Sequence, residues 1–436
     1  MPGREPRQRR GEAGLEDVAS RAAEAALAAE RAARRSYGKL VAFLAARTRD
    51  VAGAEDALSE AFAAALSGWP ASGVPDNPEA WLLTVARRRM IDAARRRHGD
   101  EALAVQLQWL QSLELIGEQQ DETPAVPDER LALMFACAHP AIDAGVRAPL
   151  MLQVILGFDA ATIASAFLVA PSAMGQRLVR AKAKIRASGI PFRVPGATEL
   201  HERLAVVLDA VYAAYAEGWS DAGGTEARRR NLAEEAIWLG RLAASLLPGE
   251  PEALGLLALM LHAQARRGAR RGDDGRYVPL AEQDTARWDA AMIDEAEALL
   301  HHAASMKRAG RYQLEAAIQS AHADRRRGGG TDWPAIVRLY DGLHALTGSP
   351  VVAINRAVAL AQVEGEAAAL HALDALAGDA RLAQYQPYWA ARAGLLARLD
   401  RHGEAEAAYE LAIGLESDPV VREFLQARRA SVAGSA

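Results

Sequence analysis

The chain has 436 residues, of which 50% are hydrophobic, 6% aromatic and 25% charged, and its net charge is -5. The single cysteine, Cys137, excludes an intramolecular disulfide. No segment approaches the roughly 18 uninterrupted apolar residues of a membrane span. These properties predict a soluble, cytoplasmic protein with no membrane contact.

Helix-forming residues dominate the sequence and predict an all-α fold. Long runs of Ala, Leu, Arg and Glu favour helix, and no strand-like alternation competes with them. The first residues are rich in arginine but precede no apolar stretch, so they predict a disordered basic tail and no secretory signal. We assign this tail and a first helix to residues 1–34.

Residues 35–98 predict one helical module that is interrupted between Ser67 and Pro78. Three prolines and two glycines in that stretch oppose helix continuation, Pro70 among them. A mixed acidic and glutamine-rich stretch over 99–127 predicts a linker that carries a short helix. A second module follows over 128–195.

Within the second module, the pattern predicts a helix-turn-helix motif. A short helix opens at Phe158, a turn ends at Pro171, and Ser172 is placed to cap a second helix. Its apolar positions share one face, and its polar positions share another. The apolar set is Met174, Leu178, Ala181 and Ile185, and the polar set is Ser172, Gln176, Arg177, Arg180 and Lys184.

Glutamine and arginine can read base edges, and arginine and lysine can hold phosphates. The second helix therefore predicts a recognition helix for duplex DNA. An ordinary helix with a solvated basic face would show the same pattern, so this alternative stays open. The basic residues are also locally concentrated, because no acid occurs between Ser172 and Arg193.

Residues 196–436 predict a C-terminal domain of helical repeats. The string Asn355–Ala361 is echoed 36 residues later by Ala391–Ala397, a period close to the roughly 34 residues of a tetratricopeptide repeat. In the clearest unit, over 390–415, Ala405, Ala408 and Ala412 would let two helices approach closely. Arginines over 266–271 are predicted to close on the aspartates of the next loop; the alternatives are that they extend a DNA footprint or contact an acidic partner.

The ordered set of an acidic helix over 50–62, a basic helix over 81–97 that begins at Trp81, a linker and a helix-turn-helix resembles the extracytoplasmic-function sigma factors of the sigma-70 family. The resemblance implies that the acidic helix binds core RNA polymerase and that the basic helix captures the melted strand of promoter DNA. The polymerase-binding residues would be Asp50, Glu55, Asp56 and Glu60, and the strand-binding residues Arg87, Arg88, Arg95 and Arg96.

Segments over 127–140, 176–185 and 189–195 resemble, more narrowly, a subgroup of these sigma factors that carries a C-terminal extension with tetratricopeptide-like repeats. Further strings over 255–261, 331–333 and 349–359 extend this resemblance to most of the chain. The resemblance implies that the extension regulates activity, and a protein partner of the repeats is an open possibility.

The resemblance implies no enzymatic activity, cofactor or metal. Cys137 and His139 lack a third orienting group, and His301 and His302 lack partners at metal-ligand spacing. A different class also remains possible: a conventional helix-turn-helix regulator joined to a repeat scaffold. That regulator would not need an acidic helix that binds polymerase.

Overall fold

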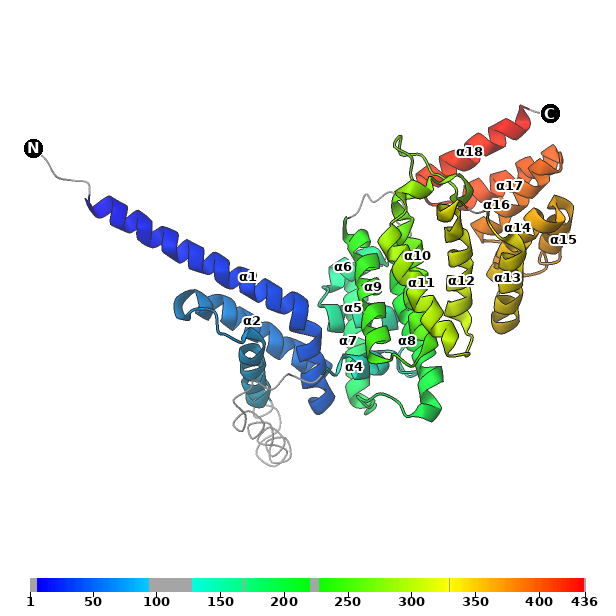
Figure 1. Ribbon diagram of the computed structural model, residues 1–436. Helices are drawn as coiled ribbons and strands as arrows, with labels where there is room; N and C mark the ends of the chain where they lie inside the picture. Colours follow the sequence, from blue (N-terminus) through cyan, green and yellow to red (C-terminus); the bar gives the residue numbers. More distant parts are fainter. Residues whose placement is uncertain (1–5, 94–127, 168, 220–226, 329, 435–436) are drawn as a thin grey trace, which may run out of the picture. The chain divides into compact units, whose positions relative to one another are not determined.

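A computed structural model of the chain describes residues 6–93, 128–167, 169–219, 227–328 and 330–434 (Figure 1). Within these ranges the chain forms α-helices and short 3-10 helices, and the sole β-type pairing is one bridge between Arg271 and Tyr277. The predicted all-α fold is confirmed. No helix in these ranges is long and apolar enough to cross a membrane.

The chain divides into two compact units, Met1–Ala214 and Tyr215–Ala436. The first unit contains a helix over 78–93 and most of α8 in addition to six complete helices. The complete helices are α1 (Pro6–Thr48), α2 (Val51–Ser72), α4 (Arg130–Cys137), α5 (Ala144–Leu156), α6 (Ala160–Ala166) and α7 (Pro171–Ala187), and α8 is Ala197–Trp219.

The core of the first unit forms around one segment of α1. Residues 40–45 of α1 are buried on every side, because α2 packs along one flank and α4 and α5 along another. Helix α4 is so enclosed that each residue from Leu131 to Cys137 is buried. The two modules predicted over 35–98 and 128–195 therefore share apolar contacts within this unit.

One local prediction for the first unit is wrong, and the interruption predicted between Ser67 and Pro78 is confirmed. Helix α1 begins at Pro6, so the residues that follow are not a disordered tail; Arg, Glu and Ala favour helix there. Helix α2 continues past Pro70 to Ser72 and stops at Gly73, whose φ of 84° ends the helix. Pro70 therefore lies inside α2, and the interruption occupies residues 73–77.

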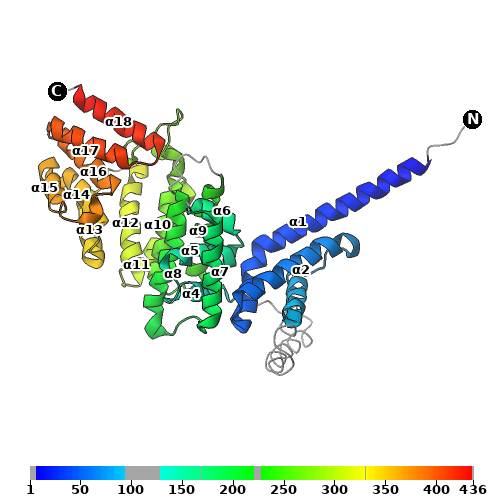
Figure 2. The same ribbon diagram turned by 180° about the vertical axis from the view of Figure 1, so that it is seen from behind.

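The second unit is a series of helices in which successive members contact each other (Figure 2). It begins with the end of α8 and then contains ten described α-helices and several 3-10 turns. These helices are α9 (Ala227–Leu246), α10 (Pro251–Ala265), α11 (Ala290–Ser305), α12 (Arg311–Ala323), α13 (Trp333–Thr347), α14 (Pro350–Glu364), α15 (Glu366–Asp374), α16 (Gln386–Arg398), α17 (His402–Leu415) and α18 (Pro419–Ala433).

Two helix pairs in this series are equivalent in position. Helices α14 and α16 begin 36 residues apart, at Pro350 and Gln386, and α15 and α17 begin 36 residues apart, at Glu366 and His402. Small residues at matching positions are fully buried in both pairs: Ala357 with Ala393, and Ala369 with Ala405. The sequence echo thus corresponds to a structural repeat of one helix pair.

The arginines over 266–271 contact several segments of the second unit. Arg267 donates to the carbonyl oxygen of Gly218 at 3.0 Å, and Arg271 donates to Asp418 at 2.9 Å. Arg270 lies 4.7 Å over the Trp219 ring. These side chains join distant segments of the second unit, because a guanidinium can donate to several carbonyls and also stack on a ring.

Candidate nucleic-acid and polymerase interface

Helix α7 presents its predicted polar face to solvent. Met174, Leu178, Ala181 and Ile185 are buried, as predicted, and pack α7 against α5 and α6. The five residues assigned to DNA are all exposed: Ser172, Gln176, Arg177, Arg180 and Lys184. The helical period therefore separates the packing face from the face that could contact a ligand.

The turn before α7 is built by α6 and by the N-terminus of α7 itself. Asp159 accepts hydrogen bonds from the backbone N–H groups of Ala161 and Thr162 and so caps α6. The predicted capping role of Ser172 is wrong: α7 begins one residue earlier, with Pro171 as its first residue and no side-chain cap. Proline at the first helical position is already fixed near a helical φ and needs no donor there.

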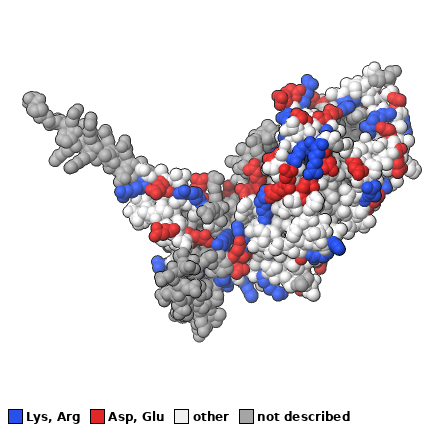
Figure 3. Space-filling model, in the orientation of Figure 1, with Lys and Arg blue, Asp and Glu red and all other residues white. Residues whose placement is uncertain are grey.

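Three basic side chains of α7 line a hollow of about 480 Å³ beside the start of α5. Arg177, Arg180 and Lys184 form one wall, and Asp143, which caps α5 through Gly145, lies on the other. The three cations favour a phosphate group, whereas the Asp143 carboxylate, which already caps α5, opposes one. On the face drawn in Figure 3, by contrast, acidic and basic side chains of the second unit are interspersed.

The basic helix over 78–93 presents only part of its predicted arginine set to solvent. Arg88 is exposed, whereas Arg87 is half-buried and its guanidinium lies 5.4 Å over the ring of Phe43. Trp81 packs edge-on against the buried Trp69, with ring centroids 5.4 Å apart. Arg95 and Arg96 lie outside the described residues.

A hollow of about 340 Å³ lies between α1 and the segment that leads into this helix. Arg31 and Ser36 of α1 and Asp76 and Asn77 of the connecting segment line it. Asn77 also caps the helix, because its side chain accepts from the backbone N–H of Ala80 at 3.0 Å. The hollow is close to the helix that was predicted to capture melted DNA.

The four acidic residues predicted to bind polymerase have different environments on and beside α2. Asp56 and Glu60 are exposed, and Glu60 forms an ion pair with Arg89 at 3.2 Å. Glu55 is only 8% exposed. Asp50 caps α2 by accepting from Gly53, and its carboxylate lies 3.4 Å from Arg186 of α7.

The Glu55–Lys182 ion pair is more buried than the ion pair between Asp50 and Arg186. Its carboxylate accepts a hydrogen bond from Lys182 of α7 at 2.7 Å, and both side chains are largely buried. Burial raises the pKa of Glu55, while the Lys182 ammonium acts in the opposite direction. Burial and the nearby Glu55 carboxylate also raise the pKa of the Tyr37 hydroxyl.

Sequence reasoning did not identify Lys182 and Arg186 as a separate group within α7. The signal was present, because they are four residues apart and so share a face that is not the face of Arg177, Arg180 and Lys184. What the sequence lacked was the partner. Glu55 of α2 lies 127 residues away from Lys182 along the chain.

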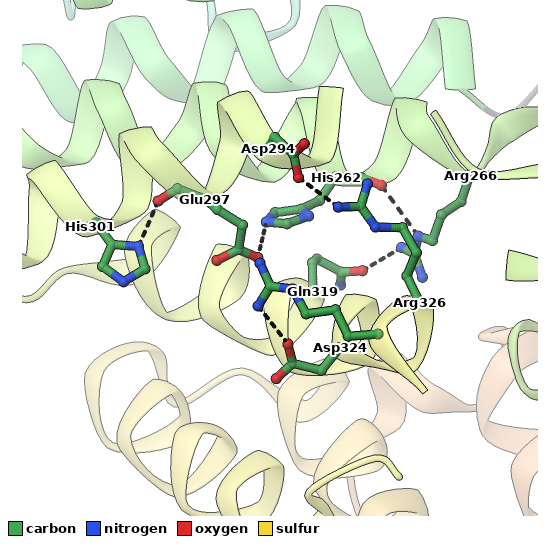
Figure 4. Close-up of polar contacts among 9 residues, drawn as sticks. His262, Arg266, Asp294, Glu297, His301, Gln319, Asp324 and Arg326 are labelled. Carbon is green, nitrogen blue, oxygen red and sulfur yellow. Dashed lines mark hydrogen bonds and ion pairs between the residues drawn. The ribbon is translucent and has the colours of Figure 1, made fainter. Parts of the chain in front are cut away.

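A buried polar cluster lies among α10, α11 and α12 of the second unit (Figure 4). His262 is 1% exposed, and its Nε2 lies 3.4 Å from the Glu297 carboxylate, beyond good hydrogen-bond geometry for either ring nitrogen. Burial and the nearby Arg266 lower the pKa of His262 to about 4, so the ring is neutral near pH 7. Arg266 donates to the His262 carbonyl oxygen and to Gln319.

A hollow of about 470 Å³ in the same unit is lined mainly by side chains of α12, α13 and α14. Trp333, Tyr340 and Val358 form much of its apolar wall, and His322 and Asn355 are polar members. The volume is in the range of small-molecule sites. No group of three or more His, Cys, Asp or Glu residues suited to a metal occurs in the part of the chain that the structure describes.

Comparison with known proteins identifies two segments of the chain. Residues 32–99 match the family model for sigma-70 region 2, which covers α2 and the basic helix. Residues 203–304 match a family of unknown function, DUF6596. No solved structure matches the chain.

An uncharacterized protein of Rhizobium meliloti (strain 1021) is 40% identical to the chain over 374 residues, which cover 84% of this chain and 86% of that protein. The region 2 match defines the class of the protein as transcription factors of the sigma type. The region 2 and DUF6596 matches support a sigma-70 family factor, and the chain belongs to one family with the Rhizobium meliloti protein. Its role is thus in RNA polymerase binding and transcription.

Proposed function

We propose that the chain is a sigma factor of the extracytoplasmic-function type that directs core RNA polymerase to a promoter. In this proposal α2 binds polymerase, the helix over 78–93 captures the melted strand, and α7 reads duplex DNA upstream. The C-terminal helical repeats, of tetratricopeptide type, regulate this activity in the cytoplasm.

The observation that carries the proposal is the two-sided character of α7. A buried apolar face fixes the helix on its module, and an exposed face presents hydrogen-bonding and cationic groups, Gln176 and Arg180 among them. A recognition helix needs this arrangement, because base edges and phosphates must be reached from a rigid support. The region 2 match supports the polymerase-binding half of the proposal.

The hollow beside Asn77 supports the strand-capturing role. Bases that leave the stack need a pocket and cations for their phosphates. The hollow supplies the space and is bordered by Arg31, although Asp76 and Glu79 also line it, and Arg88 is exposed on the helix that follows.

The proposal is tested by transcription in vitro with core polymerase and the promoter region upstream of the chain's own gene. We expect transcripts to start only when the chain is present, and Asp56→Lys to reduce them at least tenfold by reversing an exposed charge on α2. Glu364→Lys, an exposed position on α14, is the matched control and should transcribe like the wild type.

The second candidate, a conventional helix-turn-helix regulator, is favoured by the same exposed face of α7. It predicts a different outcome: the chain would bind duplex DNA but never direct initiation. Asp56→Lys would then have no effect on its activity.

A further inference from the structure

We infer that the first unit is held in a closed state in which α7 engages Glu55 and Asp50, two of the acidic residues proposed to bind polymerase, so that polymerase reaches these two residues only after α2 and α7 separate. This inference rests on the proposed function, because it concerns how the polymerase-binding face is regulated. It concerns contacts within the first unit only.

The Glu55–Lys182 ion pair lies at the contact between α2 and α7, and Glu55 is one of the residues proposed to bind polymerase. Glu55 cannot present its carboxylate to a partner protein while Lys182 holds it at 2.7 Å with both side chains mostly buried. Asp50 is engaged by Arg186 in the same way, although Arg186 is half exposed. The buried Glu55–Lys182 pair is weakly screened by salt, whereas the more exposed Asp50–Arg186 pair contributes less to stability.

Loss of one partner of the Glu55–Lys182 ion pair would destabilise the closed state. Removing one partner of a buried pair is costly, because the remaining charge loses its water without a compensating charge. Glu55 is therefore stable in the closed state only while Lys182 is present. A positively charged polymerase surface could take over the role of Lys182, and the closed state would then lose its main polar contact.

A second, apolar contact closes the same unit without any charge. Gly38 of α1 packs so closely on α5 that a Cβ there would overlap the carbonyl oxygen of Ile155, which is backbone and cannot move aside. Gly157, with a φ of 75°, lies against the ring of Tyr37 nearby. These contacts join α1 to α5, and α5 packs against α7. A side chain at position 38 would therefore push α1 and α5 apart.

The closed state lowers the apparent affinity for polymerase by the fraction of molecules that are open. Variants that weaken the closed state should therefore bind core polymerase more tightly, even though they add no new contact. This direction is diagnostic, since most substitutions at a binding surface weaken binding.

The first measurement is the affinity of the full-length chain for core polymerase in the absence of DNA. We expect Lys182→Glu, which places two like charges together, to bind at least tenfold more tightly than the wild type. Gly38→Ala should act in the same direction by pushing α1 and α5 apart. Arg193→Glu reverses an exposed charge, and Gly175→Ala adds a Cβ with open space around it, so these matched controls should bind like the wild type.

The second measurement uses Cys137, the only cysteine of the chain, as a reporter that does not depend on polymerase. Cys137 is 0% exposed in α4, and burial, with a smaller effect of the Glu55 carboxylate, raises the pKa of its thiol, so the closed state should react slowly with thiol reagents. Labelling of the Cys137 peptide, followed by mass spectrometry, should accelerate at least tenfold in Lys182→Glu and Gly38→Ala. The charge-swapped variant Glu55→Lys/Lys182→Glu should return to slow labelling, which a merely unfolded unit would not do.

Each result decides a separate question. The closed state is wrong if both opening variants label Cys137 as slowly as the wild type, or if the charge swap fails to restore slow labelling. Competition between α7 and polymerase for Glu55 and Asp50 is contradicted if wild-type Cys137 stays equally protected when polymerase is bound, or if the opening variants bind polymerase no more tightly than the wild type. A chain that never binds core polymerase contradicts the proposed function instead, and the labelling rates still decide whether α7 is held against α2.

Discussion

Two lysines on α7 have opposite surroundings although they are two residues apart. Lys182 is largely buried against Glu55, whereas Lys184 is exposed and borders the hollow beside α5. Residues two apart on a helix do not share a face. A basic residue in this helix therefore has a structural or a ligand-binding role according to its position in the helical period, and its residue type does not decide between them.

Arg180 provides a direct test of the ligand-binding face. We expect Arg180→Ala to weaken binding to the promoter duplex and to reduce the slope of log affinity against log salt by about 1, because one phosphate contact is lost. The measurement is duplex binding over a range of salt concentrations. Arg338→Ala removes an exposed arginine from α13 in the second unit and should change neither quantity; an equal loss in both variants would contradict the assignment.

His262 predicts how stability depends on pH. Its pKa is lowered to about 4 in the folded chain from an ordinary value of 6.5, so between these values the unfolded chain binds a proton that the folded chain does not. Stability is fully present above pH 6.5 and falls as the pH decreases toward 4, by up to about 3 kcal/mol. His322, with a pKa also lowered to about 4, contributes in the same direction.

The variant His262→Gln should therefore flatten the loss of stability between pH 6.5 and 4, while His322 maintains part of it. The measurement is urea unfolding followed by tryptophan fluorescence at several pH values. His302→Gln changes an exposed histidine on α11 and should leave the pH dependence as it is in the wild type. An unchanged slope in His262→Gln would show that its ring is not the group that resists protonation.

At the scale of elements, close approach between helices depends on single glycines. Gly255 of α10 lies against α12, and a Cβ there would be 2.7 Å from the backbone nitrogen of Gln313. We expect Gly255→Ala to destabilise the chain by about 1 to 3 kcal/mol, because the backbone of α12 would have to shift. Gly414→Ala in α17 meets open space and should be neutral or stabilise by up to about 1 kcal/mol; thermal unfolding of both variants distinguishes the two cases.

Local patterns predicted the elements better than their ends. The apolar positions of α7 are buried as expected, since a helical period fixes which residues share a face. The interruption predicted between Ser67 and Pro78 is confirmed at residues 73–77, although Pro70 lies inside α2. The predicted cap at Ser172 is wrong, because α7 already begins at Pro171, and proline is well suited to the first helical position. The ends of helices depend on hydrogen bonds in the last turn, which composition describes poorly.

At the scale of the whole molecule, the second unit is predicted to control the first. A chain that ends at Trp219 keeps α8 complete and removes the repeats. We expect its promoter-dependent transcription to differ from that of the full chain by at least about fivefold, the lower range for coupling between sites. Transcription with reconstituted polymerase measures this, and equal activity under all conditions would contradict a regulatory role for the repeats.

The sequence by itself determined the helical class, the exposed and buried faces of α7, and the echo that corresponds to the pairs α14–α15 and α16–α17. It did so because these properties depend on residues within one or two helical turns, or on a repeat of fixed length. Only the tertiary structure decided that Glu55 lies against Lys182, that Arg87 lies over Phe43, and that Gly38 meets Ile155. Such contacts join residues far apart in the chain, and local periodicity holds no information about which distant face an exposed-looking charge will meet.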